Sequence, residues 1–234
     1  MMIRMRRHLL RLLLALAVLF VGFPIVSIIA LRWIPPPVTS FMIHDRARAL
    51  LSRSGGGLHY RWTGWNRISP HARIAVVAAE DQNFPSHSGF DVEAIRDAID
   101  DHERGRRLRG ASTISQQVAK NLFLWPGRSF VRKGLEAYLT VLIEFFWPKQ
   151  RILEVYLNVA EIGPGIFGVG AASRAYFDEP PSELTAYEAA LLAAVLPNPK
   201  RLHADRPSAY VHGRASWIAG QMNRLGGAAY LDGF

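Results

Sequence analysis

The chain has 234 residues, enough for one sizeable domain with little room for a second, and half of its residues are hydrophobic, so a packed core is expected. The formal charge is +9, but five arginines flank one apolar stretch near the N-terminus and the remainder has an excess of only +4. That excess favours a membrane surface or a phosphate-bearing ligand, and no nucleic acid partner is expected. The absence of cysteine excludes disulfides, thiolate metal sites and a thiol nucleophile.

An uncharged apolar segment, residues 12–31, is the first organisational signal. Its length matches the roughly 30 Å of helix that crosses a bilayer core. A cleaved signal peptide is the alternative, but its apolar region is usually about 7–15 residues long and ends in a small-residue cleavage site, which Ile28, Ile29 and Ala30 do not supply. Four arginines precede the segment, so we expect residues 1–11 in the cytoplasm, a transmembrane helix over 12–31 and the rest of the chain outside.

The remaining elements follow from caps and helical periodicity. Residues 32–57 are predicted to form a spacer, stiffened by three consecutive prolines, and residues 58–234 to form one domain. Helices are predicted from Asp45 to Leu51, after Ser69-Pro70, from Asp91 to about Glu103, from Ser112 or Thr113 to about Leu122, from Lys149 to Asn158, and over Ala189–Leu196 behind a Thr185/Glu188 capping box. Alternating β-branched residues are scarce, so the expected fold is mainly α.

A carboxylate at the end of an apolar helix is the first candidate for chemistry. Glu80 follows the apolar run 74–79 and opens the segment Glu80-Asp81-x-x-Phe84-x-x-His87-x-Gly89-Phe90-Asp91. The helix dipole and the apolar neighbours penalise the charged form of Glu80, which raises its pKa toward the range that a general base needs. The alternative is an ordinary solvated Glu-Asp pair, with His87 in a structural role.

Two polar segments come next. In Gly110-Ala111-Ser112-Thr113-Ile114-Ser115-Gln116-Gln117-Val118-Ala119-Lys120-Asn121, an amide and a lysine share one helix face and suit sugar hydroxyls and a phosphate. In Arg128-Ser129-x-x-Arg132-Lys133-x-x-Glu136, three cations precede a glutamate, a pattern that suits a pyrophosphate. Solvated helix faces are the alternative for both. Residues 122–147 are strongly apolar, which fits either plain core or a part that dips into a membrane.

Five segments in this order resemble glycosyltransferase family 51. They are the Glu80 segment, the Gly110 segment, Arg132-Lys133-x-x-Glu136, Lys149-x-x-Ile152-Leu153-Glu154-x-Tyr156-Leu157-Asn158 and Gly168-Val169-Gly170-Ala171-Ala172-Ser173-x-x-Tyr176-Phe177. The resemblance covers about residues 69–199. The short chain with one N-terminal anchor is similar to the monofunctional biosynthetic peptidoglycan transglycosylases, and we expect no transpeptidase domain of the class A penicillin-binding proteins.

The resemblance implies a lysozyme-like helical lobe beside a smaller membrane-facing lobe. It also implies a catalytic base at Glu80 and a second essential carboxylate at Glu136. The substrate contacts that it implies come from Asp81, Phe84, His87, Ser112, Thr113, Gln116, Gln117, Lys120, Asn121, Arg128, Arg132 and Lys133. The chain departs from the family pattern at Ser115, where threonine is common, and at Asp178-Glu179, where a basic residue is often seen.

The implied reaction is polymerisation of peptidoglycan glycan strands from lipid II, with inversion and release of undecaprenyl pyrophosphate. No residue spacing suggests a dedicated metal site, and the sequence leaves open whether Glu136 positions the cations or holds Mg²⁺ or Mn²⁺. The implied partners are lipid II, the growing lipid-linked glycan, the membrane, and proteins of cell wall synthesis or division, at the bacterial inner membrane with the catalytic domain outside the cytoplasm.

Two other functions remain as alternatives. A lytic transglycosylase or lysozyme-like hydrolase also uses a glutamate in a helical lobe, but it needs no cationic group for a pyrophosphate. A non-catalytic envelope scaffold would have no reason to retain Glu80, Glu136 and the Gln116-Gln117 pair, all of which are present.

Overall fold

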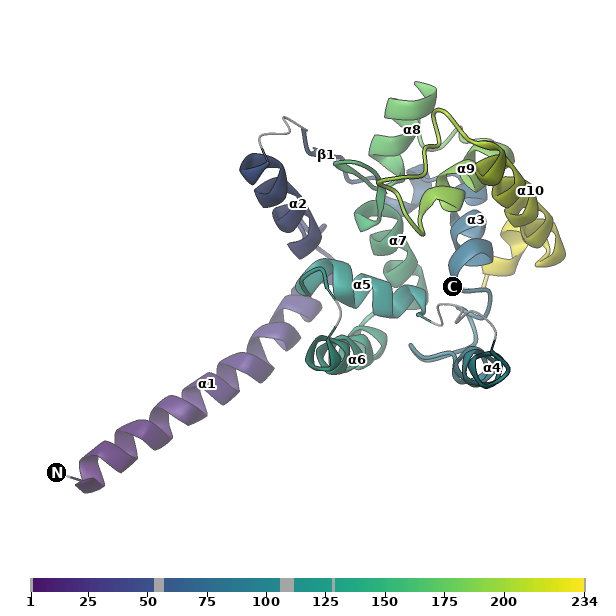
Figure 1. Cartoon of the computed structure of the whole chain (residues 1–234). Helices are drawn as coiled ribbons and strands as arrows, with labels where there is room; N and C mark the ends of the chain where they lie inside the picture. Colours follow the sequence, from purple (N-terminus) through teal and green to yellow (C-terminus); the bar gives the residue numbers. More distant parts are fainter. Residues whose placement is uncertain (1, 53–56, 106–111, 128, 234) are drawn as a thin grey trace.

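The computed structural model describes residues 2–52, 57–105, 112–127 and 129–233, and over these residues the chain is mainly helical (Figure 1). The elements are α1 (Met2–Leu31), α2 (Ser40–Leu51), β1 (His59–Tyr60), η1 (Trp65–Arg67), α3 (Pro70–Glu80), α4 (Val92–Glu103), α5 (Ile114–Phe123), α6 (Phe130–Phe146), α7 (Lys149–Val159), β2 (Glu161–Gly163), β3 (Ile166–Phe167), α8 (Val169–Phe177), α9 (Ala186–Val195), α10 (Ala209–Arg224) and η2 (Gly227–Leu231). The predicted mainly α class is confirmed, and the body is consistent with a lysozyme-like fold.

Helix starts agree with the predicted caps. The Ser69 side chain accepts a hydrogen bond from the backbone N–H of His71, and Pro70 occupies the first turn of α3. Thr113, and not Ser112, caps α5 in a capping box with Gln116. The predicted box of Thr185 and Glu188 opens α9. These signals are local, so the sequence is enough to place them.

The N-terminal part of the predicted spacer is folded onto the domain. α2 begins at Ser40, five residues before the predicted start, because Thr39 caps it by accepting from the N–H of Met42. The Met42 side chain is fully buried, α2 packs against α5, and the Tyr60 hydroxyl donates to the carbonyl of Pro36 at 2.7 Å. Residues 53–56 of the spacer lie outside the described residues.

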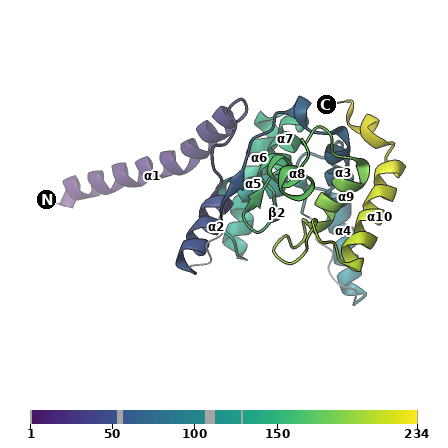
Figure 2. The ribbon, with the colours of Figure 1, turned by 90° about the horizontal axis from the view of Figure 1, so that it is seen from above.

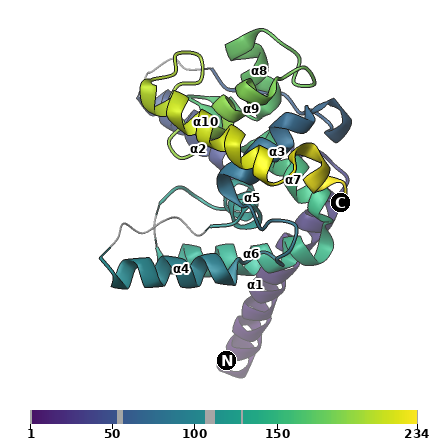
Figure 3. The ribbon, with the colours of Figure 1, turned by 90° about the vertical axis from the view of Figure 1, so that its right-hand side faces the viewer.

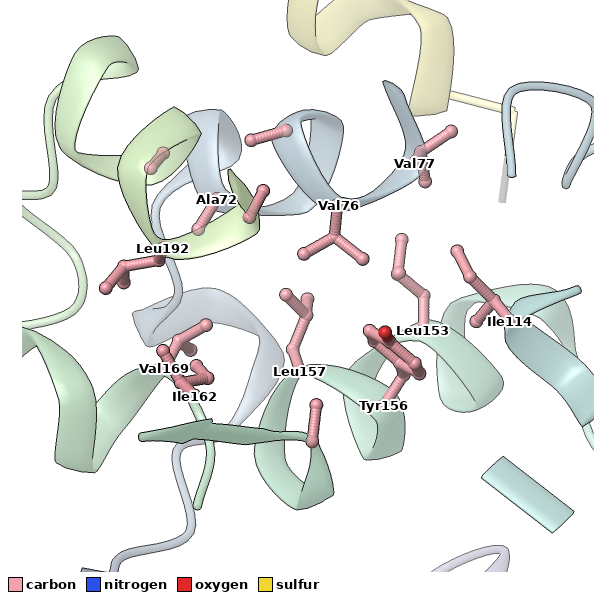
Figure 4. Close-up of a cluster of buried hydrophobic side chains, with 14 of the residues drawn as sticks. Ala72, Val76, Val77, Ile114, Leu153, Tyr156, Leu157, Ile162, Val169 and Leu192 are labelled. Carbon is pink, nitrogen blue, oxygen red and sulfur yellow. The ribbon is translucent and has the colours of Figure 1, made fainter. Parts of the chain in front are cut away.

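The core lies where α3, α7 and α9 pack together (Figure 4). Val76 of α3 points toward Leu153 and Leu157 of α7, and each of these three side chains is at most 5% exposed. The face predicted for α7, namely Ile152, Leu153, Tyr156 and Leu157, is buried throughout. Burying this continuous apolar surface is the main stabilising contribution to the body.

A small sheet was not predicted from the sequence. Its strand order is β1-β3-β2, with β1 parallel to β3 and β2 antiparallel to β3. Strands of two or three residues are too short to show alternation. Gly168 follows β3 with φ +79°, and a Cβ there would come within 2.3 Å of the Asn158 carbonyl oxygen, so the turn into α8 requires glycine.

Polar residues of the fourth motif tie α7 to the chain that crosses it. Asn158 accepts from the N–H of Thr63 at 2.7 Å and donates to the Thr63 carbonyl at 2.9 Å. Glu154 accepts from the N–H of Trp65 at 2.7 Å and from Arg151 at 2.7 Å. These buried partners explain why the motif carries polar residues on a helix that is otherwise core.

The end of α1 is fixed to the body by side chains of the α6–α7 corner. Trp147 donates from its indole N–H to the Ile28 carbonyl at 2.7 Å, and Arg151 donates to the carbonyls of Leu31 and Ile34 at 2.8 and 3.0 Å. The bond to Leu31 engages the carbonyl of the last residue of α1, which has no partner within the helix. The rest of α1 projects away from the body (Figures 1 and 2).

The predicted helix over residues 12–31 is thus present as part of α1, but its predicted span across a membrane is not confirmed. Among the residues that the structure describes, no helix is both long enough and apolar enough to cross a membrane.

α5 packs against both α7 and α6. Below the core in Figure 3, α4 and α6 extend on the side from which α1 leaves the body. α6 was not predicted as a helix. Its outward face carries Phe130, Val131, Val141 and Phe145, which are 98, 72, 55 and 79% exposed. A contiguous exposed apolar face of this kind marks a surface that contacts something other than water.

Candidate functional site

Glu80 is the last residue of α3, where the helix brings it to the edge of the core. Its side chain is 16% exposed, and its Oε2 accepts a hydrogen bond from Gln117 Nε2 at 2.8 Å. Burial raises the pKa of the Glu80 carboxyl, and the Gln117 hydrogen bond and the charges of Arg214 and Lys120 oppose that rise. The carboxyl is therefore placed to accept a proton more readily than a solvated glutamate.

A second hydrogen bond sets the orientation of the amide that holds Glu80. The Tyr156 hydroxyl donates to Gln117 Oε1 at 3.1 Å, so the other end of the amide, the Nε2 donor, faces Glu80. Burial raises the pKa of Tyr156 well above its usual value, so the hydroxyl keeps its proton and remains a donor. Gln117, predicted as a substrate contact, thus has both ends of its amide engaged with the protein.

Asp81 and His87 connect the end of α3 to the start of α5. The Asp81 carboxylate accepts from the backbone N–H of Ile114 at 2.9 Å and from His87 Nε2 at 2.9 Å, and its side chain is 2% exposed. His87 Nδ1 accepts from the N–H of Gly89 at 3.1 Å, so the neutral ring carries its proton on Nε2. The predicted substrate contacts at both residues stay predictions, and the geometry gives them a positioning role.

Gly89 shows how closely these segments approach one another. Its φ is +91°, and a Cβ there would come within 2.8 Å of Thr140 Cγ2 on α6. Its carbonyl accepts from the Thr113 hydroxyl at 2.7 Å. Glycine is therefore required where the Glu80 segment passes between α5 and α6.

Four further predicted contacts are buried. Phe84 is 0% exposed and belongs to the core, with the Lys149 ammonium 4.5 Å from its ring centre. Thr113, Gln116 and Asn121 are 2, 4 and 8% exposed, and the first two form the capping box of α5. Ser112, by contrast, is exposed, and its hydroxyl lies 3.5 Å from Lys133 Nζ.

Three cations and one carboxylate gather where α5 faces α6. Glu136 is 3% exposed, and its two oxygens accept from Arg132 at 2.6 Å and from Lys133 at 2.5 Å. Burial lowers the pKa of Lys120, the nearby charges of Arg132 and Lys133 lower it further, and the charges of Glu136 and Glu80 oppose the shift. Lys120 therefore interacts electrostatically with both predicted catalytic carboxylates. Arg128 lies outside the described residues.

The surroundings of Glu136 do not suit a divalent ion. Both of its oxygens are already paired with cations. Among the described residues no group of three or more histidines, aspartates and glutamates is placed to hold a metal. Of the two roles left open by the sequence, the geometry favours positioning of the cations, and no step below depends on Mg²⁺ or Mn²⁺.

A polar cleft of about 300 Å³ opens beside Glu80. The end of α3, the start of α4 and the segment before α5 line it, and Trp217 of α10 completes it. Arg214, one turn earlier on α10, places Nη2 4.0 Å from Glu80 Oε1. Sequence reasoning missed α10, because Ser208 caps it without a partner glutamate and its apolar face is weak.

The chain is similar to known proteins over nearly its whole length. The transglycosylase family model matches residues 48–223. A protein of Xanthomonas campestris pv. campestris (strain B100), named biosynthetic peptidoglycan transglycosylase, is 54% identical over 98% of this chain and 94% of its own length. Proteins of the same name from Stutzerimonas stutzeri (strain A1501) and Pseudomonas putida are 52 and 53% identical, over 97 and 91% of this chain and 94 and 90% of their own lengths. The chain belongs to the transglycosylase family, glycosyltransferase family 51.

Proposed function

We propose that this chain polymerises the glycan strands of peptidoglycan from lipid II, with Glu80 as the catalytic base. One observation carries the proposal. A largely buried carboxylate, held through one oxygen by Gln117, lies between a polar cleft and the cations of α5 and α6. The base for a sugar hydroxyl and the counter-charge for a pyrophosphate are therefore adjacent. The names of the similar proteins support the same substrate class.

The reaction is a single in-line displacement. Glu80 takes the proton from the 4-hydroxyl of the acceptor N-acetylglucosamine, and the hydroxyl oxygen attacks C1 of the donor N-acetylmuramic acid. The bond from C1 to undecaprenyl pyrophosphate breaks, and the pyrophosphate leaves with the electron pair. Because the α-linked donor is attacked from the opposite face, the product is β-1,4-linked.

The cations of α5 and α6 stabilise the leaving group. Lys120 is partly buried, so its charge acts in a medium of lower dielectric than water, where each charge is worth more. Arg132 and Lys133 are held in place by Glu136 through direct ion pairs. We propose that Glu136 acts by positioning these cations, which makes it a positioning residue for the reaction. The same cationic group argues against a hydrolase, because a finished glycan has no pyrophosphate to bind.

We propose further that the protein works at the bacterial inner membrane, anchored by α1 and resting on the outward face of α6. That face exposes Phe130, Val131, Val141 and Phe145, and α1 leaves the body on the same side. The lipid tail of lipid II would remain in the bilayer while its sugars reach Glu80. This arrangement suits a substrate whose reactive end is polar and whose other end is membrane-bound.

Glu80→Gln tests the proposal directly. The amide keeps the size of the side chain but cannot accept the hydroxyl proton, so polymerisation of lipid II in detergent should fall by about 10²–10⁴-fold. Lipid II affinity should persist, because the cations are untouched. Glu93→Gln, an exposed change on α4, is the matched control and should leave the rate unchanged. A folded Glu80→Gln protein that polymerises at nearly the wild-type rate contradicts the mechanism.

A further inference from the structure

α10 presents two side chains toward the catalytic carboxylate, although it lies outside all five sequence motifs. Arg214 and Trp217 are three residues apart and therefore lie on the same side of the helix. Arg214 faces Glu80, and Trp217 lines the cleft that begins at Glu80. The packing of α10 against α3 fixes this face relative to the base (Figure 3).

Trp217 is half exposed, at 50%. An indole is among the largest apolar surfaces that a side chain offers, and leaving half of it in water forgoes much of the stabilisation that its burial would give. Unlike Trp147, which is 3% exposed and anchors α1, Trp217 borders an open cleft. Its free surface is therefore available to a ligand in that cleft.

The other groups around the cleft indicate what kind of ligand fits. The lining carries carboxylates, amides and hydroxyls, including Gln82, Asn83, Asp91 and Ser112, and no lysine or arginine among the described lining residues. The carboxylates of the lining, Asp81 and Asp91 among them, disfavour a phosphate at this place. A neutral, polyhydroxylated ring fits better, because it offers hydroxyls to polar groups at its edge and an apolar C–H face to an aromatic ring.

We propose that Trp217 is the stacking platform for the acceptor N-acetylglucosamine of lipid II. The sugar that loses a proton to Glu80 must lie within hydrogen-bond reach of it, and the cleft starts at that residue. The reacting end of the acceptor is uncharged, as the lining requires, whereas the pyrophosphate of the donor belongs near the cations Lys120, Arg132 and Lys133. The inference rests on the proposed function and adds a residue that determines how the acceptor binds.

The test varies donor and acceptor independently. The donor is a lipid-linked glycan whose terminal 4-hydroxyl is blocked, so that it cannot act as an acceptor, and the acceptor is lipid II. Trp217→Ala in the full chain should raise the KM for lipid II about tenfold, with the KM for the blocked donor unchanged. Trp217→Phe should retain most of the wild-type affinity, because it keeps an aromatic face. Circular dichroism checks that each variant is folded.

Tyr210→Ala is the matched control, since Tyr210 is an aromatic residue of the same helix, 60% exposed and not part of the cleft lining. It should leave both KM values unchanged. An unchanged KM for lipid II in folded Trp217→Ala overturns the proposal, and so does a change confined to the donor, which would assign the cleft to the donor sugar. In both cases the wild-type protein still polymerises, whereas a wild-type protein without polymerase activity would contradict the proposed function itself.

Discussion

Among single residues, the hydrogen bonds at Glu80 determine which of its oxygens can act as a base. Oε2 is occupied by Gln117, whereas Oε1 faces the more distant guanidinium of Arg214 at 4.0 Å. The Tyr156 hydroxyl keeps the amide from turning over. If Gln117 presented its oxygen instead, two acceptors would meet unless Glu80 were protonated, so the amide orientation favours the ionised carboxylate.

Tyr156→Phe should therefore alter the pH dependence of polymerisation. Without the hydroxyl the amide is free to turn, the hydrogen bond that lowers the pKa of Glu80 weakens, and that pKa rises further above the ordinary glutamate value. A base with a higher pKa needs a higher pH to be ionised, so the acidic limb of the kcat/KM profile should move up by about one pH unit. At high pH the variant should approach the wild-type rate.

Tyr138→Phe provides the control for this shift, because its buried hydroxyl has no hydrogen-bond partner among the described residues. Its profile should coincide with that of the wild-type protein. A Tyr156→Phe profile that also coincides with it would show that the amide orientation does not depend on the tyrosine.

Among the elements, α6 carries two proposed functions on opposite faces. Arg132 and Glu136 are buried toward α5, while Phe130 and Phe145 point outward. The same helix therefore holds the proposed pyrophosphate-binding cations and the proposed membrane contact. Each phenylalanine that enters the acyl region would contribute about 1.5–3 kcal/mol to binding.

Labelling can test where the outer face of α6 lies. The chain contains no cysteine, so a single introduced cysteine is a unique attachment point for a nitroxide. In liposomes, labels at Phe130→Cys and Phe145→Cys should be accessible to oxygen and shielded from a water-soluble nickel complex. A label at Tyr210→Cys, at an exposed position in the first turn of α10, should show the reverse. Equal exposure to the nickel complex at all three positions would remove α6 from the membrane surface.

For the whole molecule, the proposed topology places the N-terminus and the C-terminus on opposite sides of a membrane. A reporter that is active only outside the cytoplasm should work when fused after Phe234 and fail when fused before Met1, because four arginines precede the apolar segment. N-terminal sequencing of the mature protein is the second measurement. A mature N-terminus near Ala30 would replace the anchor by a cleaved signal.

The extent to which the sequence predicts this structure depends on how local each signal is. Helix starts at Ser69, Thr113 and Thr185 were predictable, because each cap and its partner lie within a few residues. The contact between Tyr156 and Gln117 joins positions 39 residues apart, and nothing near either residue indicates it. Trp217 lies still farther along the chain from Glu80, so its place beside the base emerges only when α10 packs on α3.

For the predicted substrate contacts, too, some properties could be predicted from the sequence and others could not. The chemical types of the site residues were predictable, since carboxylates, amides and cations are the groups that bind sugars and phosphates. The burial of each residue was not predictable, and it separates Asp81 and Gln116, which hold the fold around the site, from Lys120, which interacts electrostatically with both carboxylates. Motif residues of α7 such as Asn158 proved to be structural ties for the same reason.

The junction of α1 with the body has a consequence for the direction in which product leaves. Trp147 and Arg151 donate hydrogen bonds to carbonyl groups at the end of α1, so the helix does not rotate freely relative to the body. With α1 upright in a bilayer, the body would keep one bearing relative to the membrane plane, and so would the opening beside Glu80. Each added disaccharide would then move the growing strand in the same direction relative to the membrane. The orientation of the enzyme would thereby set the orientation of the new glycan strand.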